Sequence, residues 1–149
     1  MIRFLQEKEK NEIFRLALQV EQLFGKMVGI KEFENAVEES LKSHKVIGYI
    51  EKGEVHGSVI IDSAKNEIAW FVVDKEKRGL GIGKKLLEYA LEILDSRKDI
   101  TVQTFASSIP EGDSARRLYI KYGFKDDKDG GNNPAGIPTI IMKLNKTNR

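Results

Sequence analysis

Three glycines at alternate positions, Gly79, Gly81 and Gly83, stand between an apolar run and a helix-forming pattern. Glycine lets backbone N–H groups approach an anion without a Cβ in the way, and the first turn of a helix offers free N–H donors at the positive end of its dipole. Arg78 and Lys84 flank the glycines and can add charge-assisted contacts. The segment from Arg78 to Lys84, which we call the glycine nest, therefore predicts a site for a phosphate group.

Two other glycine motifs do not fit these residues. A Walker A loop would need glycine at Arg78 and serine or threonine at Lys85. A dinucleotide fingerprint would need its third glycine at Lys84. A nucleotide-binding protein therefore has little support, and the glycines taken alone could also form only a tight turn before a helix.

A second motif follows the glycine nest along the chain. The nest has the R-G-x-G-x-G pattern, and residues 115–124 read ARRLYIKYGF, which has the pattern A-x-x-L-Y-x-x-x-G-F. Both patterns resemble those of the GNAT acetyltransferase superfamily, in the same order and separated by a helix and a strand. The resemblance covers residues 46–149, and the two N-terminal helices match the family's layout without a motif.

The resemblance implies that acetyl-coenzyme A binds where the strand before the nest splays from the next one. The main chain of that strand would pair with the pantetheine arm, and the amides of the nest would bind the pyrophosphate. The implied cofactor-binding residues are Phe71, Val72, Val73, Arg78, Gly79, Leu80, Gly81, Ile82, Gly83 and Lys84.

The resemblance also implies two catalytic residues. Tyr119 would protonate the leaving coenzyme A thiolate, because its hydroxyl donates at neutral pH; the alternative is a helix residue buried under the sheet. Glu67, six residues before Val73, resembles a glutamate that deprotonates the acceptor amine, usually through water. Glu67 could equally be a solvent-facing residue, with a water chain as the base. Many relatives carry asparagine where Gly112 stands, and Asp113 or Ser114 is expected to cap the following helix.

The activity implied is N-acetyl transfer from acetyl-coenzyme A to a primary amine, by direct attack in a ternary complex. The alternative is a sensor of acyl-coenzyme A or an interaction module without turnover, which the intact Tyr119 disfavours. The acceptor cannot be read from the sequence, because residues 25–33 and 125–138, the loops expected to build its site, are variable in the family. The string NPAGIPTIIM at residues 133–142 is either a wall of the acceptor site or a rigid connection. The same resemblance implies a homodimer through the final strands.

The elements that must position these residues follow from the hydrophobic period. Helical spacing predicts helices over residues 7–24, 30–44, 84–94 and 114–122, and short runs predict strands at residues 2–5, 46–50, 55–61, 67–73, 100–106 and 139–144. Residues 125–138 are polar and rich in glycine and proline, and we expect a long turn there. The predicted fold class is α/β, the GNAT acyl-CoA N-acyltransferase fold, with a mixed, mostly antiparallel sheet of six to seven strands and helices on both faces.

Composition sets the outer limits. The 149 residues suit a single domain spanning 1–149. The net charge of +2, from 25 basic and 23 acidic residues, leaves no basic stripe, so no nucleic-acid partner is expected. The sequence has no cysteine, and its two histidines are isolated, which argues against a metal site. No apolar run suits a signal peptide or membrane span, so we expect a soluble, cytoplasmic protein that does not associate with membranes.

Overall fold

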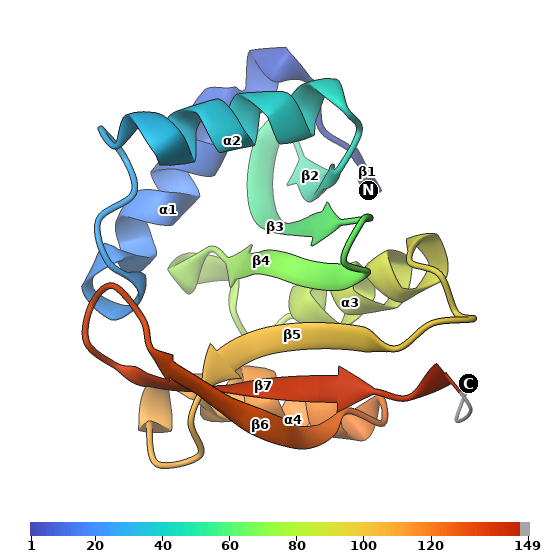
Figure 1. The fold of residues 1–149 in the computed structure, drawn as a ribbon. Coiled ribbons are helices and arrows are strands. Elements are labelled where there is room, and N and C mark those ends of the chain that lie inside the picture. Colours follow the sequence, from blue (N-terminus) through green and yellow to red (C-terminus); the bar gives the residue numbers. More distant parts are fainter. Residues whose placement is uncertain (147–149) are drawn as a thin grey trace.

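The computed structural model describes residues 1–146, in which one sheet of seven strands runs through the centre of the molecule (Figure 1). The strand order is β1-β2-β3-β4-β5-β7-β6, and every neighbouring pair is antiparallel except β4 and β5. This confirms the predicted mixed, mostly antiparallel sheet. The strands are β1 (Ile2–Phe4), β2 (Val46–Glu51), β3 (Glu54–Asp62), β4 (Glu67–Val73), β5 (Ile100–Phe105), β6 (Lys125–Asn132) and β7 (Pro138–Leu144).

Helices cover both faces of the sheet, as predicted (Figure 1). On one face, apolar side chains of α1 and α2 pack against β2, β3 and β4. On the other face, α3 and α4 pack against strands on both sides of the β4–β5 junction. The helices are α1 (Lys10–Phe24), α2 (Lys31–Lys42), α3 (Ile82–Ile93) and α4 (Asp113–Lys121), with short 3-10 turns at η1 (Glu7–Glu9), η2 (Lys75–Lys77) and η3 (Pro110–Gly112).

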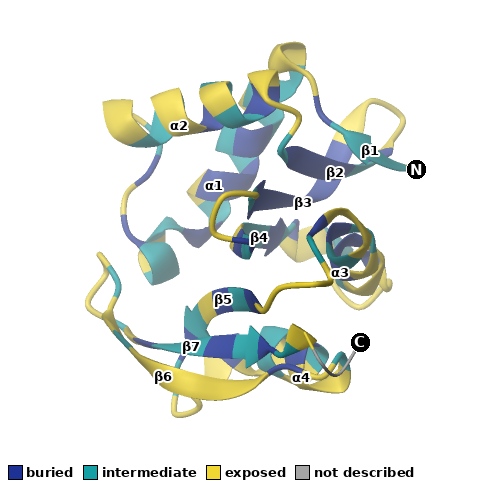
Figure 2. Cartoon of the chain, turned by 45° about the vertical axis from the view of Figure 1, so that its right-hand side comes forward, coloured by how far each residue is buried: buried dark blue, intermediate teal, exposed yellow. Residues whose placement is uncertain are grey.

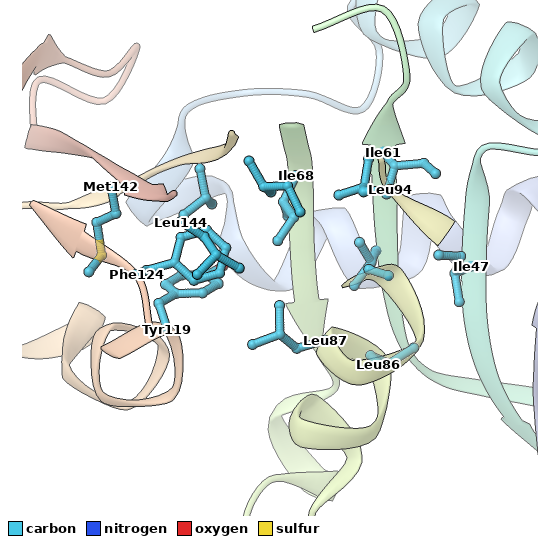
Figure 3. Packing of buried hydrophobic residues seen from close by; sticks show 14 of the residues in the cluster. Ile47, Ile61, Ile68, Leu86, Leu87, Leu94, Tyr119, Phe124, Met142 and Leu144 are labelled. Atoms are coloured by element: carbon cyan, nitrogen blue, oxygen red, sulfur yellow. The ribbon is translucent and has the colours of Figure 1, made fainter. Parts of the chain in front are cut away.

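The core under α3 and α4 holds the two parts of the sheet together. Figure 3 shows Ile47 and Ile61 from the β1–β4 part and Met142 and Leu144 from the β5–β7–β6 part in this one cluster. Burying apolar surface stabilises by roughly 25 cal/mol per Å². The parts are therefore joined by side-chain packing as well as by backbone pairing.

The expected long turn at residues 125–138 is wrong for its first half, which forms the strand β6 (Lys125–Asn132) paired with β7. Its sequence lacks apolar alternation because β6 is the outer strand, with nearly every side chain exposed (Figure 2). Backbone hydrogen bonds to β7 define this strand, and two register shifts accommodate its irregular sequence. An ion pair between Arg116 and Asp126, at 2.6 Å, fastens it to α4.

The expected helix cap at Asp113 or Ser114 is also wrong. The 3-10 turn η3 runs directly into α4, and no side chain caps the helix. Glycine at position 112 lets the turn η3 lie close to β5, because a Cβ built there would lie 2.7 Å from the Cβ of Phe105. A larger residue at position 112 would push the turn away from β5.

None of the helices in residues 1–146 combines the length and the apolar composition that crossing a membrane requires.

Candidate active site

The sheet opens between its two parallel strands. β4 and β5 pair only at Glu67 with Thr101 and at Ile68 with Val102. Beyond these two pairs the strands diverge, and a cavity of about 680 Å³ lies in the opening, reaching from α1 on one face to α3 and α4 on the other. The edge of β4 that faces this cavity offers backbone N–H and C=O groups that β5 does not engage. An extended ligand lying there can pair with the strand.

A bulge in β4 sets which side chains face each side of the opening. The register passes from Ile61 opposite Ile68 to Ile60 opposite Trp70, so Ala69 is the extra residue on β4. Phe71 consequently joins the core on the α3 and α4 face, while Trp70 packs on the α1 face. The bulge thereby places one aromatic residue on each side of the cavity.

The glycine nest lies at the mouth of this opening. Gly79 and Gly81 have φ of 78° and 81°, the left-handed region that glycine adopts without strain. Gly81 is the N-cap of α3, and the first N–H groups of that helix have no partner within the helix. The side chains of Lys77 and Arg78 also line the cavity. A phosphate group fits this place, because the nest offers free amides, the N-terminus of a 12-residue helix and two cations.

A buried carboxylate anchors the approach to the nest. Asp74, which is 4 % exposed, accepts hydrogen bonds from the Glu76 N–H at 3.0 Å, from Arg15 Nη1 at 2.8 Å and from Gln19 Nε2 at 3.3 Å. Burial opposes ionisation of Asp74, but these three donors together hold the pKa of its carboxyl below the usual range. Gln19 Oε1 also accepts the Lys75 N–H at 3.0 Å. Side chains of α1 therefore fix the turn that enters the nest.

Tyr119 lies at the wall of the cavity on the α4 side. Tyr119 is 3 % exposed, and its ring contacts those of Phe71 and Phe124, with ring centroids 6.2 and 5.5 Å away. Figure 3 shows Tyr119 beside Phe124. Burial raises the pKa of its hydroxyl, and no hydrogen bond to a residue in the described part of the chain contributes to this shift. The hydroxyl is therefore protonated at neutral pH and available to donate to a ligand.

On the α1 face, the end of α1 and the loop between β6 and β7 meet beside the cavity. Asn133 Nδ2 donates to the Leu23 carbonyl at 2.7 Å, and the rings of Phe24 and Phe105 meet edge to face at 5.5 Å. Gly25 is required at this junction, because a Cβ there would lie 2.6 Å from Pro134. Asn133, Pro134 and Thr139 of the string at residues 133–142 line the cavity.

Most of the predicted site residues line this one cavity. Those that line it are Phe71, Val72, Val73, Arg78, Gly79, Gly81, Ile82, Gly83 and Tyr119. Leu80 and Lys84 are exposed and are not part of the lining. Glu67 is also outside the lining, at the closed end of the opening. Because Ile68 packs in the core under α3 and α4, strand alternation turns Glu67 toward the α1 face.

Sequence reasoning missed the aromatic wall of the cavity, which includes Phe24, Trp70 and Phe105. Their apolar character predicted only core positions. Trp70 carried the clearest available signal, since it is the one tryptophan of the chain and its N–H needs a partner. In the described residues its Nε1 is buried without a hydrogen bond.

A mixed sheet that splits at two parallel strands, with a glycine nest opening the helix after the split, defines an acetyltransferase fold. The chain belongs to the GNAT acetyltransferase family, because residues 6–146 match the Acetyltransferase (GNAT) domain. No match was found among curated proteins.

Solved structures of other acetyltransferases share this fold. A GNAT family acetyltransferase of Bacillus cereus superposes with a TM-score of 0.75 at 18 % identity, covering 97 % of this chain and 96 % of the other. A ribosomal-protein-alanine N-acetyltransferase of Brucella melitensis gives 0.76 at 15 % identity, with 97 % and 99 % covered. The PaiA N-acetyltransferase of Thermoplasma acidophilum, solved in complex with coenzyme A, gives 0.64 at 17 % identity, with 97 % and 98 % covered. At these identities the similarity concerns the fold alone.

Proposed function

We propose that this protein is an N-acetyltransferase that moves the acetyl group of acetyl-coenzyme A to a primary amine by direct attack in a ternary complex. One observation carries the proposal: the opening between β4 and β5, the glycine nest and Tyr119 all contribute to a single cavity. A thioester, a pyrophosphate and an incoming amine each find a matching surface there.

The cofactor half follows from the backbone. The free edge of Phe71, Val72 and Val73 pairs with the amides of the pantetheine arm, and the nest amides bind the pyrophosphate. Arg78 and Lys77 add charge at the same end. The coenzyme A complex of the Thermoplasma protein, which shares this fold, supports the assignment.

In the transfer step, the amine nitrogen forms a bond to the thioester carbonyl carbon and the carbon–sulfur bond breaks. Tyr119 donates its hydroxyl proton to the departing thiolate, while its ring holds the hydroxyl in place. Glu67 is proposed as the base, and its position outside the cavity lining requires it to act through water.

Replacing Glu67 by glutamine should lower kcat and leave acetyl-coenzyme A binding unchanged. An unchanged kcat would assign the base to a water chain instead.

Calorimetric titration with acetyl-coenzyme A, with ATP and NAD as controls, tests the cofactor half. Release of coenzyme A in the presence of an amine panel then tests transfer, and the absence of cysteine keeps a thiol reagent free of background from the protein. We expect selective binding and amine-dependent release. Binding without release from any amine would support the sensor instead. Cytoplasmic location and a homodimer stay predictions, the second measurable by analytical ultracentrifugation.

A further inference from the structure

The wall of the cavity on the α1 face is mainly apolar. Of the described residues that line the cavity, the charged ones are Lys77, Arg78 and Glu111. The two cations belong to the phosphate end, and Glu111 lies in the turn that leads into α4. The wall on the α1 face is therefore built from uncharged side chains, among them Leu23, Phe24, Trp70, Phe105 and Pro134.

Two polar side chains of this wall, those of Asn133 and Gln103, are engaged within the protein. Asn133 binds Leu23 through its Nδ2, and its Oδ1 accepts the N–H groups of Ala135 and Ile137 at 2.9 and 3.1 Å. Gln103 donates to Thr139 Oγ1 at 2.8 Å. These groups hold the loop in shape, so apolar contact is the main interaction that the wall offers to an acceptor.

A cationic group on the acceptor would find no opposite charge among the side chains of this wall. Moving a charge out of water is unfavourable unless an opposite charge or a set of hydrogen bonds replaces the water. A second ammonium group, as in a polyamine or an aminoglycoside, would have to lie against Leu23 or the aromatic side chains. The wall therefore discriminates against acceptors with more than one positive charge.

The junction between α1 and the β6–β7 loop also limits the size of the acceptor. The Asn133–Leu23 hydrogen bond and the contact of Gly25 with Pro134 join the end of α1 to the β6–β7 loop. These two segments lie side by side in Figure 1. A polypeptide that reacts at an internal lysine needs a groove that the chain can leave at both ends. A small molecule needs only the pocket.

We propose that the acceptor is a small primary amine with an uncharged, apolar body, aliphatic or aromatic. This rests on the proposed transferase function and specifies its substrate class. The reacting amine would lie at the opening between β4 and β5, and its body would contact the wall formed by Phe24, Trp70 and Phe105.

A matched pair of substrates tests this on the intact protein. Hexylamine and hexamethylenediamine have the same six-carbon body and differ by one distal ammonium group. We expect kcat/KM for hexylamine to exceed that for hexamethylenediamine by about tenfold or more, the ratio that corresponds to one lost ion contact. Phenethylamine should resemble hexylamine, while spermidine and a hexapeptide should resemble the diamine.

A charge placed in the wall should change this preference. Leu23→Glu adds a carboxylate at the cavity, and we expect it to shift the ratio of the two kcat/KM values at least about tenfold toward the diamine. Leu18→Glu is the matched control, because Leu18 is on the same helix, 57 % exposed and outside the lining. It should keep the wild-type ratio, and circular dichroism checks that both variants fold.

The outcomes separate this inference from the transferase function. If the wild type uses the diamine, spermidine or the peptide as well as hexylamine, the substrate class is wrong and the transferase function stands. If acetyl-coenzyme A binds and no amine is acetylated, both are wrong. A ratio that Leu23→Glu and Leu18→Glu change equally would mean that the wall does not select the acceptor.

Discussion

Tyr119 combines a buried aromatic ring with a hydroxyl that has no hydrogen-bond partner in residues 1–146. Packing against Phe71 and Phe124 fixes the ring, so the hydroxyl needs no protein hydrogen bond to be oriented. Burial disfavours the phenolate, which keeps the proton on the oxygen until a stronger base, such as a thiolate, develops beside it. The same packing that makes Tyr119 a core residue suits it to donate a proton.

Replacing Tyr119 by phenylalanine should therefore separate chemistry from binding. The ring contacts persist, so we expect the melting temperature and the dissociation constant of acetyl-coenzyme A to change little. The proton donor is lost, and kcat should fall about a hundredfold, the lower end of general acid catalysis. Steady-state kinetics and calorimetry on the same preparation measure both effects. A kcat within threefold of the wild type would remove Tyr119 from the mechanism.

Gly81 should matter for binding through its backbone. Alanine at φ of 81° is strained by about 1–2 kcal/mol, and its Cβ would project into the open space of the nest. Gly53 provides the control, because it has a similar φ of 78° and open surroundings in the turn between β2 and β3. We expect Gly81→Ala and Gly53→Ala to lose similar stability in urea. Only Gly81→Ala should weaken acetyl-coenzyme A binding, by at least about tenfold; equal binding by the two variants would exclude the nest as the phosphate site.

At the scale of residues, the sequence predicted the groups whose chemistry depends on local order. The glycines of the nest must lie directly at the start of a helix, so their spacing can be recognised in the sequence. Trp70 and Phe105 face the same cavity only because β4 bulges at Ala69 and separates from β5. That geometry arises from tertiary structure and leaves no pattern in either strand.

Among the elements, α1 links the two functional ends of the molecule. Arg15 and Gln19 hold Asp74 before the nest, and Leu23 and Phe24, further along the same helix, border the acceptor end. The sequence predicted the apolar face of this helix from its period. Its polar contacts could not be predicted, because Arg15 and Asp74 are 59 residues apart in the chain.

Asp74 should make stability depend on pH in a defined direction. Its folded pKa lies below the ordinary aspartate value of about 4, so the unfolded state binds more protons as pH falls through this range. The stabilisation is fully present above about pH 4 and is lost as pH falls through the folded pKa. We expect Asp74→Asn to cost about 1.5–3 kcal/mol of unfolding free energy at pH 7, as for a hydrogen-bonded charge.

Urea unfolding of both proteins at pH 7, 5, 4 and 3 measures the effect. The difference between wild type and Asp74→Asn should be constant above about pH 4 and shrink below it. Asp127→Asn is a suitable control, because the 3.4 Å pair of Asp127 with Lys143 lies at the surface, and its loss should cost less than about 1 kcal/mol. A difference for Asp74→Asn that grows on acidification would contradict the assigned pKa direction.

The strand β6 illustrates the limit of element prediction from sequence. Central strands such as β3 bury almost every side chain and show it in their composition. An outer strand needs only backbone pairing on one side, so the charged residues 125–129 gave no strand signal. The predicted helices and the other strands, which carry the core, agree with the structure to within a few residues.

For the whole molecule, the architecture followed from the order of the predicted elements, and the resemblance carried by the two motifs implied that the strand before the nest splays from the next one. Only two residue pairs join β4 to β5, and one apolar core spans both parts of the sheet. A ligand that pairs with the free edge of β4 would add contacts between those parts. Acetyl-coenzyme A should therefore stabilise the whole chain, which we propose is one domain.

This leads to a prediction for thermal unfolding. A ligand at a hundred times its dissociation constant adds about 2.7 kcal/mol, which for a chain of this size raises the melting temperature by roughly 5–10 °C. Trp70, the one tryptophan, lines the cavity, so its fluorescence reports on the opening while far-ultraviolet circular dichroism reports on the sheet and helices. Both signals should show a single coincident transition, shifted equally by acetyl-coenzyme A and unshifted by ATP. Two separate transitions would mean that the parts of the sheet unfold independently. A shift in the Trp70 signal alone would mean that the ligand orders the cavity without stabilising the whole fold.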